Sequence, residues 1–470
     1  MGLTKGGKSA LSVFYGDNFM RQKNDMLSGN VIKSILVFAF PIMLSQLLQY
    51  NYAFVDNIIV GRYAGTNELA AVGNVGAINS LIIGAALGLT SGFTIPVAHA
   101  YGAKDKRGVA KYAGSSIVVA FLIGLFIVVM AHIVSTPLLR LIGTPEEILK
   151  LSAAYVNILY FAVPLQMLSN NFTAISRAVG ESRKPLYFYT VSVAVNFALD
   201  LLFVKYLRWG VQGAAWATMI SHGAAALLTG IYVFRFNDRV DIKKEDLRLN
   251  KVIALEQLKL GIPVSLQFTI TSIGSMALQS AVNSFGASVM AGFTAAARVE
   301  NITNIPISGF GVSAQTFVGQ NYGAKNYERI KKGVRSILLM NVLTAAIMSI
   351  IYYFAGPWAV SLFMSEQSQA IMDAAKGYIT AISQCYVLVA VLLTLRNSLQ
   401  GLGFTYANMI AGAGELFGRL AVAFIFTPLI GFAAVCYAGP AAWLLADIPL
   451  AIIYLWKKRT VLSEKIPVEK

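Results

Sequence analysis

Two acidic residues stand inside long apolar runs in the first half of the chain, where an ionised carboxylate costs several kcal/mol unless it is used. Asp56 lies near the end of the first run and Asp200 in the fifth. Asn196 precedes Asp200 by one helical turn, so both share a helix face, and Thr218 lies in the sixth run among small residues. Such a set of oxygen atoms suits a proton or a small hard cation. The alternative is an interhelical hydrogen-bond network with no further role.

Charged residues in the apolar runs of the second half are secondary candidates. Glu415 and Arg419 are spaced i,i+4, which suits an ion pair with either a structural or a gating role. Arg298 and Glu300 are two residues apart, so they point in different directions and need partners elsewhere. Asp447, in the last run, is a candidate neighbour of one of the arginines.

The sequence lacks the motifs of soluble enzymes. It contains no GxxxxGK[ST] phosphate loop, so we expect no use of ATP, and neither a GxSxG elbow nor an HExxH pair occurs. Cys385 and Cys436 lie in apolar runs without metal or redox spacing. The isolated His99, His132 and His222 are predicted to pack rather than to bind metal. We therefore expect no enzyme activity and no cofactor.

The elements that position these residues are predicted to cross a membrane. Hydrophobic residues make up 56% of the chain and charged residues 13%, which excludes an ordinary soluble protein. Runs of about 20 apolar residues cross a hydrocarbon core of about 30 Å as helices. We predict an all-α integral membrane fold with twelve transmembrane helices, at 34–57, 68–97, 112–135, 149–176, 185–206, 211–235, 255–284, 288–318, 334–356, 372–400, 405–427 and 431–456.

The net charge of +16 predicts topology rather than nucleic-acid binding. With the N-terminus inside, the inner segments hold 29 Lys and Arg and the outer loops hold 5, so both termini are predicted to be cytoplasmic. No signal peptide is expected from the polar first thirty residues. The predicted organisation is an N-terminal tail (1–32), an N-lobe with helices 1–6 (33–236), a cytoplasmic linker (237–254), a C-lobe with helices 7–12 (255–456) and a C-terminal tail (457–470).

The two halves of the chain repeat each other at a nearly constant offset. Pro41 is echoed by Pro263, the YGAK sequence at 101–104 by YGAK at 322–325, and RAVG at 177–180 by QGLG at 400–403. Two six-helix bundles in a membrane favour a transporter with its substrate between them. Because proline removes a helix hydrogen bond, Pro41 is a candidate hinge as well as an architectural bend.

The chain resembles the multidrug and toxic compound extrusion (MATE) transporters, and more closely their bacterial DinF-like and MepA-like branch. The resemblance spans about residues 33 to 459. It rests on the spacing of Pro41 and Asp56, on NFALD at 196–200, on GVQGAAWAT at 210–218 and on GFGVSAQTFVGQNYGAK at 309–325.

This resemblance implies two bundles related by a pseudo-twofold axis, with a V-shaped central cavity. It implies antiport in the cell (inner) membrane of a bacterium, in which H⁺ or Na⁺ enters while an organic, often cationic, compound leaves. The cation site then comprises Asp56, Asn196, Asp200 and Thr218, and Pro41 is the bending point of the first helix. We expect a monomer that works in the lipid bilayer on small organic molecules.

One departure from related proteins narrows the expected site. NorM-type relatives carry an acid on the seventh helix, where this chain has Thr271, and another on the tenth, where 378–400 contains no Asp or Glu. A C-lobe cation site of that type is therefore predicted to be missing. Glu300 and Glu415 stay possible secondary contributors.

Two other functions are considered. A flippase for lipid-linked saccharides has a similar two-bundle cavity and is expected to line it with cationic residues, for which the candidates are Arg298, Arg396 and Arg419. A membrane-embedded enzyme such as an acyltransferase needs a nucleophile or a His/Asp pair at the membrane surface, and none of the three histidines has an acid three or four residues away.

Overall fold

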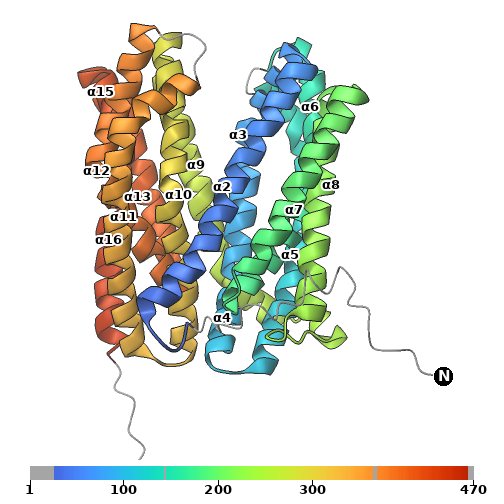
Figure 1. Ribbon diagram of the computed structural model, residues 1–470, viewed down its shortest axis with the longest axis vertical. Coiled ribbons are helices and arrows are strands. Elements are labelled where there is room, and N and C mark those ends of the chain that lie inside the picture. Colours follow the sequence, from blue (N-terminus) through green and yellow to red (C-terminus); the bar gives the residue numbers. More distant parts are fainter. Residues whose placement is uncertain (1–25, 142–143, 364–367, 464–470) are drawn as a thin grey trace, which may run out of the picture.

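The computed structural model describes residues 26–141, 144–363 and 368–463, and the regular elements within them are all helical (Figure 1). The first half comprises α2 (Val31–Tyr63), α3 (Thr66–Phe93), α4 (Ile95–Gly102), α5 (Lys106–Leu141), α6 (Glu146–Ala178), α7 (Arg183–Asp200) with its π-helical extension η1 (Leu201–Tyr206), and α8 (Gly210–Ile231) with η2 (Tyr232–Phe236). The second half comprises α9 (Lys251–Asn283), α10 (Ala287–Gly323), α11 (Tyr327–Leu362), α12 (Gln369–Gly401), α13 (Tyr406–Ala421) with the π-helical η4 (Val422–Phe426), α14 (Thr427–Ile430), α15 (Phe432–Cys436) and α16 (Ala438–Thr460). Between them, the connecting segment contains one short helical turn, η3 (Lys244–Leu247).

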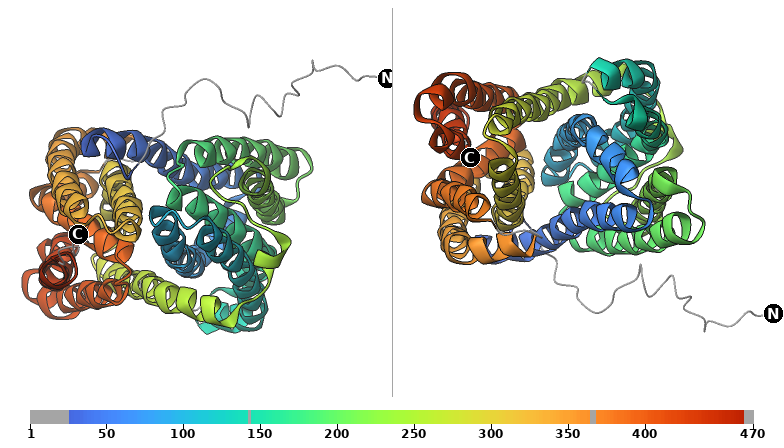
Figure 2. Two further views of the ribbon diagram at one scale, coloured as in Figure 1. Left: turned by 90° about the horizontal axis from the view of Figure 1, so that it is seen from below. Right: turned by 90° about the horizontal axis from the view of Figure 1, so that it is seen from above.

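Within the described residues, eleven helices are long and apolar enough to cross a membrane. The remaining long helix, α10, has 37 residues and is more polar, because it carries Arg298, Glu300 and a second half rich in Gly, Ser, Gln and Asn. The long helices form two bundles, and the bundles diverge towards one end of the molecule (Figures 1 and 2). The prediction of an all-α membrane fold is confirmed.

The repeat extends to the signals that begin the helices. Asn30 precedes α2 and its side chain accepts a hydrogen bond from the Lys33 backbone N–H, while Asn250 precedes α9 and accepts from those of Val252 and Ile253. An N-cap of this type satisfies N–H groups that the helix itself leaves unpaired. Equivalent caps therefore start the first helix of each half.

These two first helices each pack against both halves of the molecule. The early residues Ile35, Phe38 and Ile42 of α2 belong to the same buried cluster as the second-half helices, whereas its later residues Ile59 and Val60 belong to a cluster of the first half. Helix α9 does the reverse: Ala254 packs in the first half, and Leu278 and Val282 in the second. Each of the two helices therefore connects the two bundles.

The bundles meet at one end through a contact that repeats with the sequence. Here His99 Nε2 lies 2.7 Å from the carbonyl oxygen of Gly401, and Gln320 Nε2 donates to the carbonyl oxygen of Ala178 at 2.8 Å. His99 and Gln320 are 221 positions apart, and Ala178 and Gly401 are 223 apart, so the two hydrogen bonds are counterparts in the repeat. We call this pair of hydrogen bonds the inter-lobe lock.

Two glycines of the YGAK turns allow this close approach. A Cβ at Gly102 would overlap the backbone carbonyl of Gln320, and a Cβ at Gly323 would overlap that of His99. Backbone therefore packs on backbone across the two lobes, which only glycine permits. The turns themselves need a left-handed residue, supplied by Lys104 and Lys325 at φ 59° and 54°.

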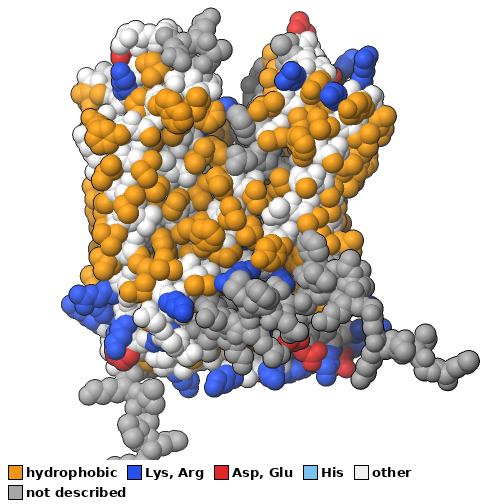
Figure 3. All heavy atoms as spheres, in the orientation of Figure 1, with side chains coloured by type: hydrophobic (Ala, Val, Ile, Leu, Met, Phe, Trp, Pro, Cys, Tyr) orange, Lys and Arg blue, Asp and Glu red, His pale blue; other side chains and the backbone are white. Residues whose placement is uncertain are grey.

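The surface has the pattern of a membrane protein. Apolar side chains cover the middle of the molecule, and Lys and Arg gather at the end that holds the inter-lobe lock (Figure 3). At the opposite end the surface is hollowed between the lobes. The structure is thus closed at its basic end and open at the other.

We predict that Gly102→Ala, like Gly323→Ala, loosens the inter-lobe lock. The added methyl group has no space, and overpacking of this kind costs about 1–3 kcal/mol, which shifts a closed-to-open ratio by roughly fivefold or more. Spin labels at the exposed positions Lys106 and Arg335, in a background with Cys385→Ala and Cys436→Ala, should report a larger population of long distances. Gly73→Ala is the matched control, because nothing lies within 4 Å of its added Cβ. Unchanged distances in both lock variants would contradict the prediction.

Candidate functional site

The four predicted cation-site residues come from three helices that pack together in the first half. Asp56 lies on α2, Asn196 and Asp200 on α7, and Thr218 on α8. All four are buried, with 6%, 2%, 0% and 8% of their surface exposed, respectively. The structure therefore brings together residues that are up to 162 positions apart in the sequence.

The oxygen atoms of this cluster lack the hydrogen-bond donors that buried oxygen normally has. The carboxyl groups of Asp56 and Asp200 lie near each other, and the Asn196 side chain lies near Asp200. Yet Asp56 Oδ1, both carboxylate oxygens of Asp200 and Thr218 Oγ1 have no hydrogen-bond partner among the described residues. Two ionised carboxylates are acceptors only, so they cannot bond to each other without a proton or a cation between them. The cluster has the chemistry of a cation or proton site.

The backbone changes its helical form at this cluster. Helix α7 ends at Asp200 and continues as the π-helical turn η1, which lies against α2. Such turns are frequent at functional sites because they re-aim the side chains next to them. The sequence carried no signal for this feature.

A cavity of about 380 Å³ lies between the two lobes beside the inter-lobe lock, whose residues Ala178 and Gly401 are among its lining. Its walls come from α2, α3, α4, α6 and α7 on one side and from α9, α10 and α12 on the other. About half of the lining residues are neutral hydrogen-bonding ones, namely five Gln, two Asn, five Ser and three Thr. Tyr189 and Phe268 are the aromatic members of the described lining. A volume of this size suits a small organic molecule.

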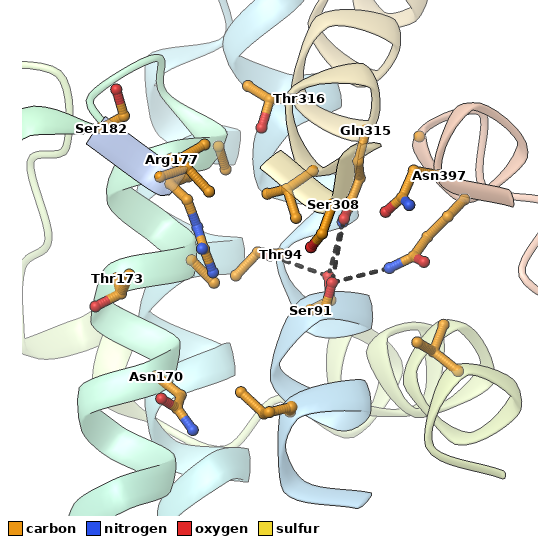
Figure 4. A pocket seen from close by; sticks show the side chains of 18 of the residues that line it. Ser91, Thr94, Asn170, Thr173, Arg177, Ser182, Ser308, Gln315, Thr316 and Asn397 are labelled. Atoms are coloured by element: carbon orange, nitrogen blue, oxygen red, sulfur yellow. Dashed lines mark hydrogen bonds between the residues drawn. The ribbon is translucent and has the colours of Figure 1, made fainter. Parts of the chain in front are cut away.

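Hydrogen bonds connect polar side chains of the cavity wall across the two lobes. Ser91 donates to Gln315 Oε1 at 3.2 Å and accepts from Gln400 Nε2 at 2.8 Å (Figure 4). Gln400 Oε1 in turn accepts from Asn408 Nδ2 at 2.7 Å. Hydrogen bonds therefore tie α3 of the first half to α10, α12 and α13 of the second.

The charged groups on the described cavity wall are both cationic. Arg177 from α6 and Arg396 from α12 line the cavity, and neither Asp nor Glu is among its described lining residues. Arg298 and Arg419, the other two candidates for a cationic cavity, are not among the lining residues.

Arg396 is held by a buried carboxylate in the second half. Its Nη2 pairs with Oε1 of Glu415, while the other oxygen of Glu415 lies 3.4 Å from Nη1 of Arg419 and 3.4 Å from the Thr271 hydroxyl. The spacing of Glu415 and Arg419 predicted their pair, but the shorter contact is to Arg396 on another helix. Glu415 is thus shared between two arginines.

The other charged candidates of the second half lie apart from one another. Glu300 accepts a hydrogen bond of 2.6 Å from the Tyr378 hydroxyl, and Arg298 is exposed, so the two point in different directions as predicted. Asp447 is buried and lies near enough to Arg396 and Glu415 to interact with their charges. Neither of its carboxylate oxygens has a hydrogen-bond partner among the described residues. No group of three or more His, Cys, Asp and Glu side chains is placed to hold a metal ion in the described part of the chain.

Sequence reasoning missed three features of the site and its surroundings, namely the cavity position of Arg177, the contact of His99 with the other lobe and the partner of Arg396. The cavity position of Arg177 was not foreseen, although its repeat counterpart is the neutral Gln400, and this exchange of charge was a usable signal. His99 was expected to pack, and it does so as part of the inter-lobe lock. The pairing of Arg396 with Glu415 had no signal, since the two lie on different helices.

Two helical lobes around a polar cavity are the architecture of a membrane carrier. The model of the MatE family matches residues 41–202 and 263–439, more than half of the chain. The probable multidrug resistance protein YoeA of Bacillus subtilis (strain 168) is 30% identical over 345 residues, which cover 72% of this chain and 74% of that protein. The multidrug export protein MepA of Staphylococcus aureus (strain MRSA252) is 22% identical over 451 residues, covering 93% of this chain and 97% of its own.

The same fold occurs in solved structures. One, described as the outward-facing conformation of a multidrug resistance MATE family transporter of the MOP superfamily, has a TM-score of 0.86 and 24% identity, and covers 94% of this chain and 99% of its own. The chain belongs to the MatE family. It is accordingly a multi-pass membrane transporter of the multidrug efflux type, and not an enzyme.

We predict that Glu415→Gln strongly destabilises the protein. Removing one partner of a buried ion pair leaves the arginine charge uncompensated, at a cost of about 3–5 kcal/mol. Thermal unfolding of the detergent-purified protein, followed by intrinsic fluorescence, should show a lower midpoint. The double variant Arg396→Gln with Glu415→Gln should recover part of the loss.

The matched control for this experiment is an exposed pair. Glu328 lies 2.8 Å from Lys331 at the surface, where ion pairs contribute little, so Glu328→Gln should leave the midpoint unchanged. A Glu415→Gln variant as stable as the wild type would show that Glu415 does not stabilise the two arginines.

Proposed function

We propose that this chain exports small organic compounds by antiport, with H⁺ or Na⁺ entering at the cluster of Asp56, Asn196, Asp200 and Thr218. The observation that carries the proposal is the proximity of two buried carboxyl groups whose oxygens lack donors among the described residues. Charge in a membrane protein interior is costly and persists where it is used. No resident cofactor and no ATP take part in this proposal.

The exchange proceeds by alternating access between the two lobes. A proton or Na⁺ at Asp56 and Asp200 removes the repulsion between their carboxylates, which favours one arrangement of α2 against α7. A bound ion shifts such an equilibrium only through its different affinity for the two arrangements. Because α2 also lines the cavity with Ser45, Gln46 and Gln49, the arrangement of α2 determines the shape of the substrate site.

The proposed orientation places both termini in the cytoplasm. The basic end of the molecule then faces inward, in keeping with the excess of Lys and Arg in inner segments. The inter-lobe lock lies at that end, so the state seen here is closed to the cytoplasm and open to the outside. The protein works as a monomer, since each chain supplies both walls of the cavity.

We predict that Asp56→Asn and Asp200→Asn uncouple transport. The full chain is reconstituted in liposomes, and efflux of rhodamine 6G and of pyrenesulfonate is followed while a pH gradient or a Na⁺ gradient is imposed separately. In the wild type one of the two gradients accelerates efflux. Each variant should lose that acceleration by at least about fivefold, as expected when a coupling free energy of 1–3 kcal/mol is removed.

The control is Asp373→Asn, which removes an exposed carboxylate that accepts a hydrogen bond from Gln369 within its own helix. It should transport as the wild type does. Gradient-driven efflux of wild-type rate in both N-lobe variants would overturn the assignment of the cluster. The gradient that drives the wild type identifies the coupling ion.

A further inference from the structure

We propose that the cavity between the lobes binds organic molecules through an anionic group, such as a carboxylate, sulfonate or phosphate, with Arg177 as its counter-ion. This substrate class rests on the proposed transport function, because the cavity is then the substrate site. It differs from the cationic compounds that the family resemblance implies. The inference starts from the charge of the described cavity wall, which contains no acid and two arginines, of which Arg396 is paired with Glu415 and Arg177 is not.

Arg177 has no counter-ion within the described part of the chain. It is partly buried on the last turn of α6, and neither an ion pair nor a hydrogen bond joins its guanidinium to another described residue. The acid nearest in sequence, Glu181, is used elsewhere, since its Oε1 accepts from the backbone N–H groups of Arg183 and Lys184. A charge in such a position favours a ligand of opposite charge.

The side chain extends into the cavity. Figure 4 shows the Arg177 guanidinium directed back along α6, to the level of Thr173 and opposite Thr94. Asn170, Thr173 and Arg177 are spaced by three and four residues, so they share one face of α6, and all three line the cavity. This face offers an amide, a hydroxyl and a guanidinium to the same space.

Two of the described lining residues carry buried hydrogen-bond donors without a described partner. Asn170 Nδ2 and Arg396 Nε are buried without a partner among the described residues, and Gln46 Oε1 is the corresponding unpaired acceptor. With the guanidinium of Arg177, the free donors suit a ligand rich in acceptors. An organic anion is such a ligand.

Comparison of the two halves indicates that the fold does not require the positive charge of Arg177. The counterpart of Arg177 is Gln400, a neutral residue that is hydrogen-bonded to Ser91 and Asn408. The following residues, Ala178 and Gly401, keep the same role in the inter-lobe lock. Since a glutamine serves in one half, the arginine of the other half is free to serve the ligand.

The test uses two fluorescent probes that share one ring system and differ in charge, 1-pyrenesulfonate and 1-pyrenemethylammonium. Their equilibrium binding to the full chain is measured in nanodiscs of phosphatidylcholine. The wild type should bind the sulfonate more tightly. Arg177→Gln should weaken sulfonate binding by at least about tenfold, the range for a charge-assisted hydrogen bond, and leave ammonium binding no weaker. Arg177→Lys should retain part of the affinity.

The matched control is Arg335→Gln, which removes an exposed arginine outside the cavity and should bind as the wild type does. Thermal unfolding of Arg177→Gln establishes that it is folded. A wild type that prefers the ammonium probe, or a folded Arg177→Gln with unchanged sulfonate affinity, would overturn the inference.

Two further arms identify the source of the anion and separate this inference from the proposed function. If phosphatidylglycerol in the nanodisc competes with the sulfonate in the wild type but not in Arg177→Gln, the anionic group belongs to a lipid; absence of competition assigns it to a soluble compound. Either result retains the anion site. Binding in nanodiscs is measured without an ion gradient. Failure of ion coupling in the liposome assay therefore does not affect the test of the anion site, and failure of sulfonate binding does not affect the test of ion coupling.

Discussion

The inter-lobe lock is the contact on which the rest of the structure depends. Two hydrogen bonds to backbone carbonyls, one from His99 and one from Gln320, join lobes that are separate at the opposite end. The two glycines of the YGAK turns let backbone meet backbone there. The cavity exists because the lobes touch on one side of it and part on the other.

Helix α2 contacts the second half of the molecule, the cavity and the cluster of Asp56 with Asp200. Its first turns pack under the second half, its middle lines the cavity through Gln46 and Gln49, and Asp56 follows ten residues after Gln46. At 1.5 Å per residue, the ion cluster lies about 15 Å along the helix from the cavity wall. One helix thus extends from the proposed ion site to the proposed substrate site. A change in how α2 meets Asp200 necessarily moves the wall on which a compound rests, which is a physical basis for coupling.

Much of this organisation was predictable from the sequence, because it depends on local pattern. Apolar runs predict helices, the repeat predicts two related bundles, and acids inside apolar runs predict a buried cluster. The passage of α2 and α9 between the bundles was not predictable, since an apolar helix carries no sign of which neighbour it packs on. The same holds for Glu415, whose i,i+4 partner Arg419 was read from the spacing while its closer partner, Arg396, depends on how α12 and α13 meet.

The broken symmetry of the repeat separates architecture from chemistry. The features that both halves share, such as the inter-lobe lock and the helix caps, stabilise the fold. Asp56 has Leu278 as its counterpart, which is buried in the core of the second half, so the fold accepts an apolar residue there. Arg177 has the neutral Gln400. Both departures give the first half an uncompensated charge, acidic towards the open end and basic beside the lock. A carrier that binds a cation at one of these places and an anionic group at the other keeps its two ligands apart by charge as well as by distance.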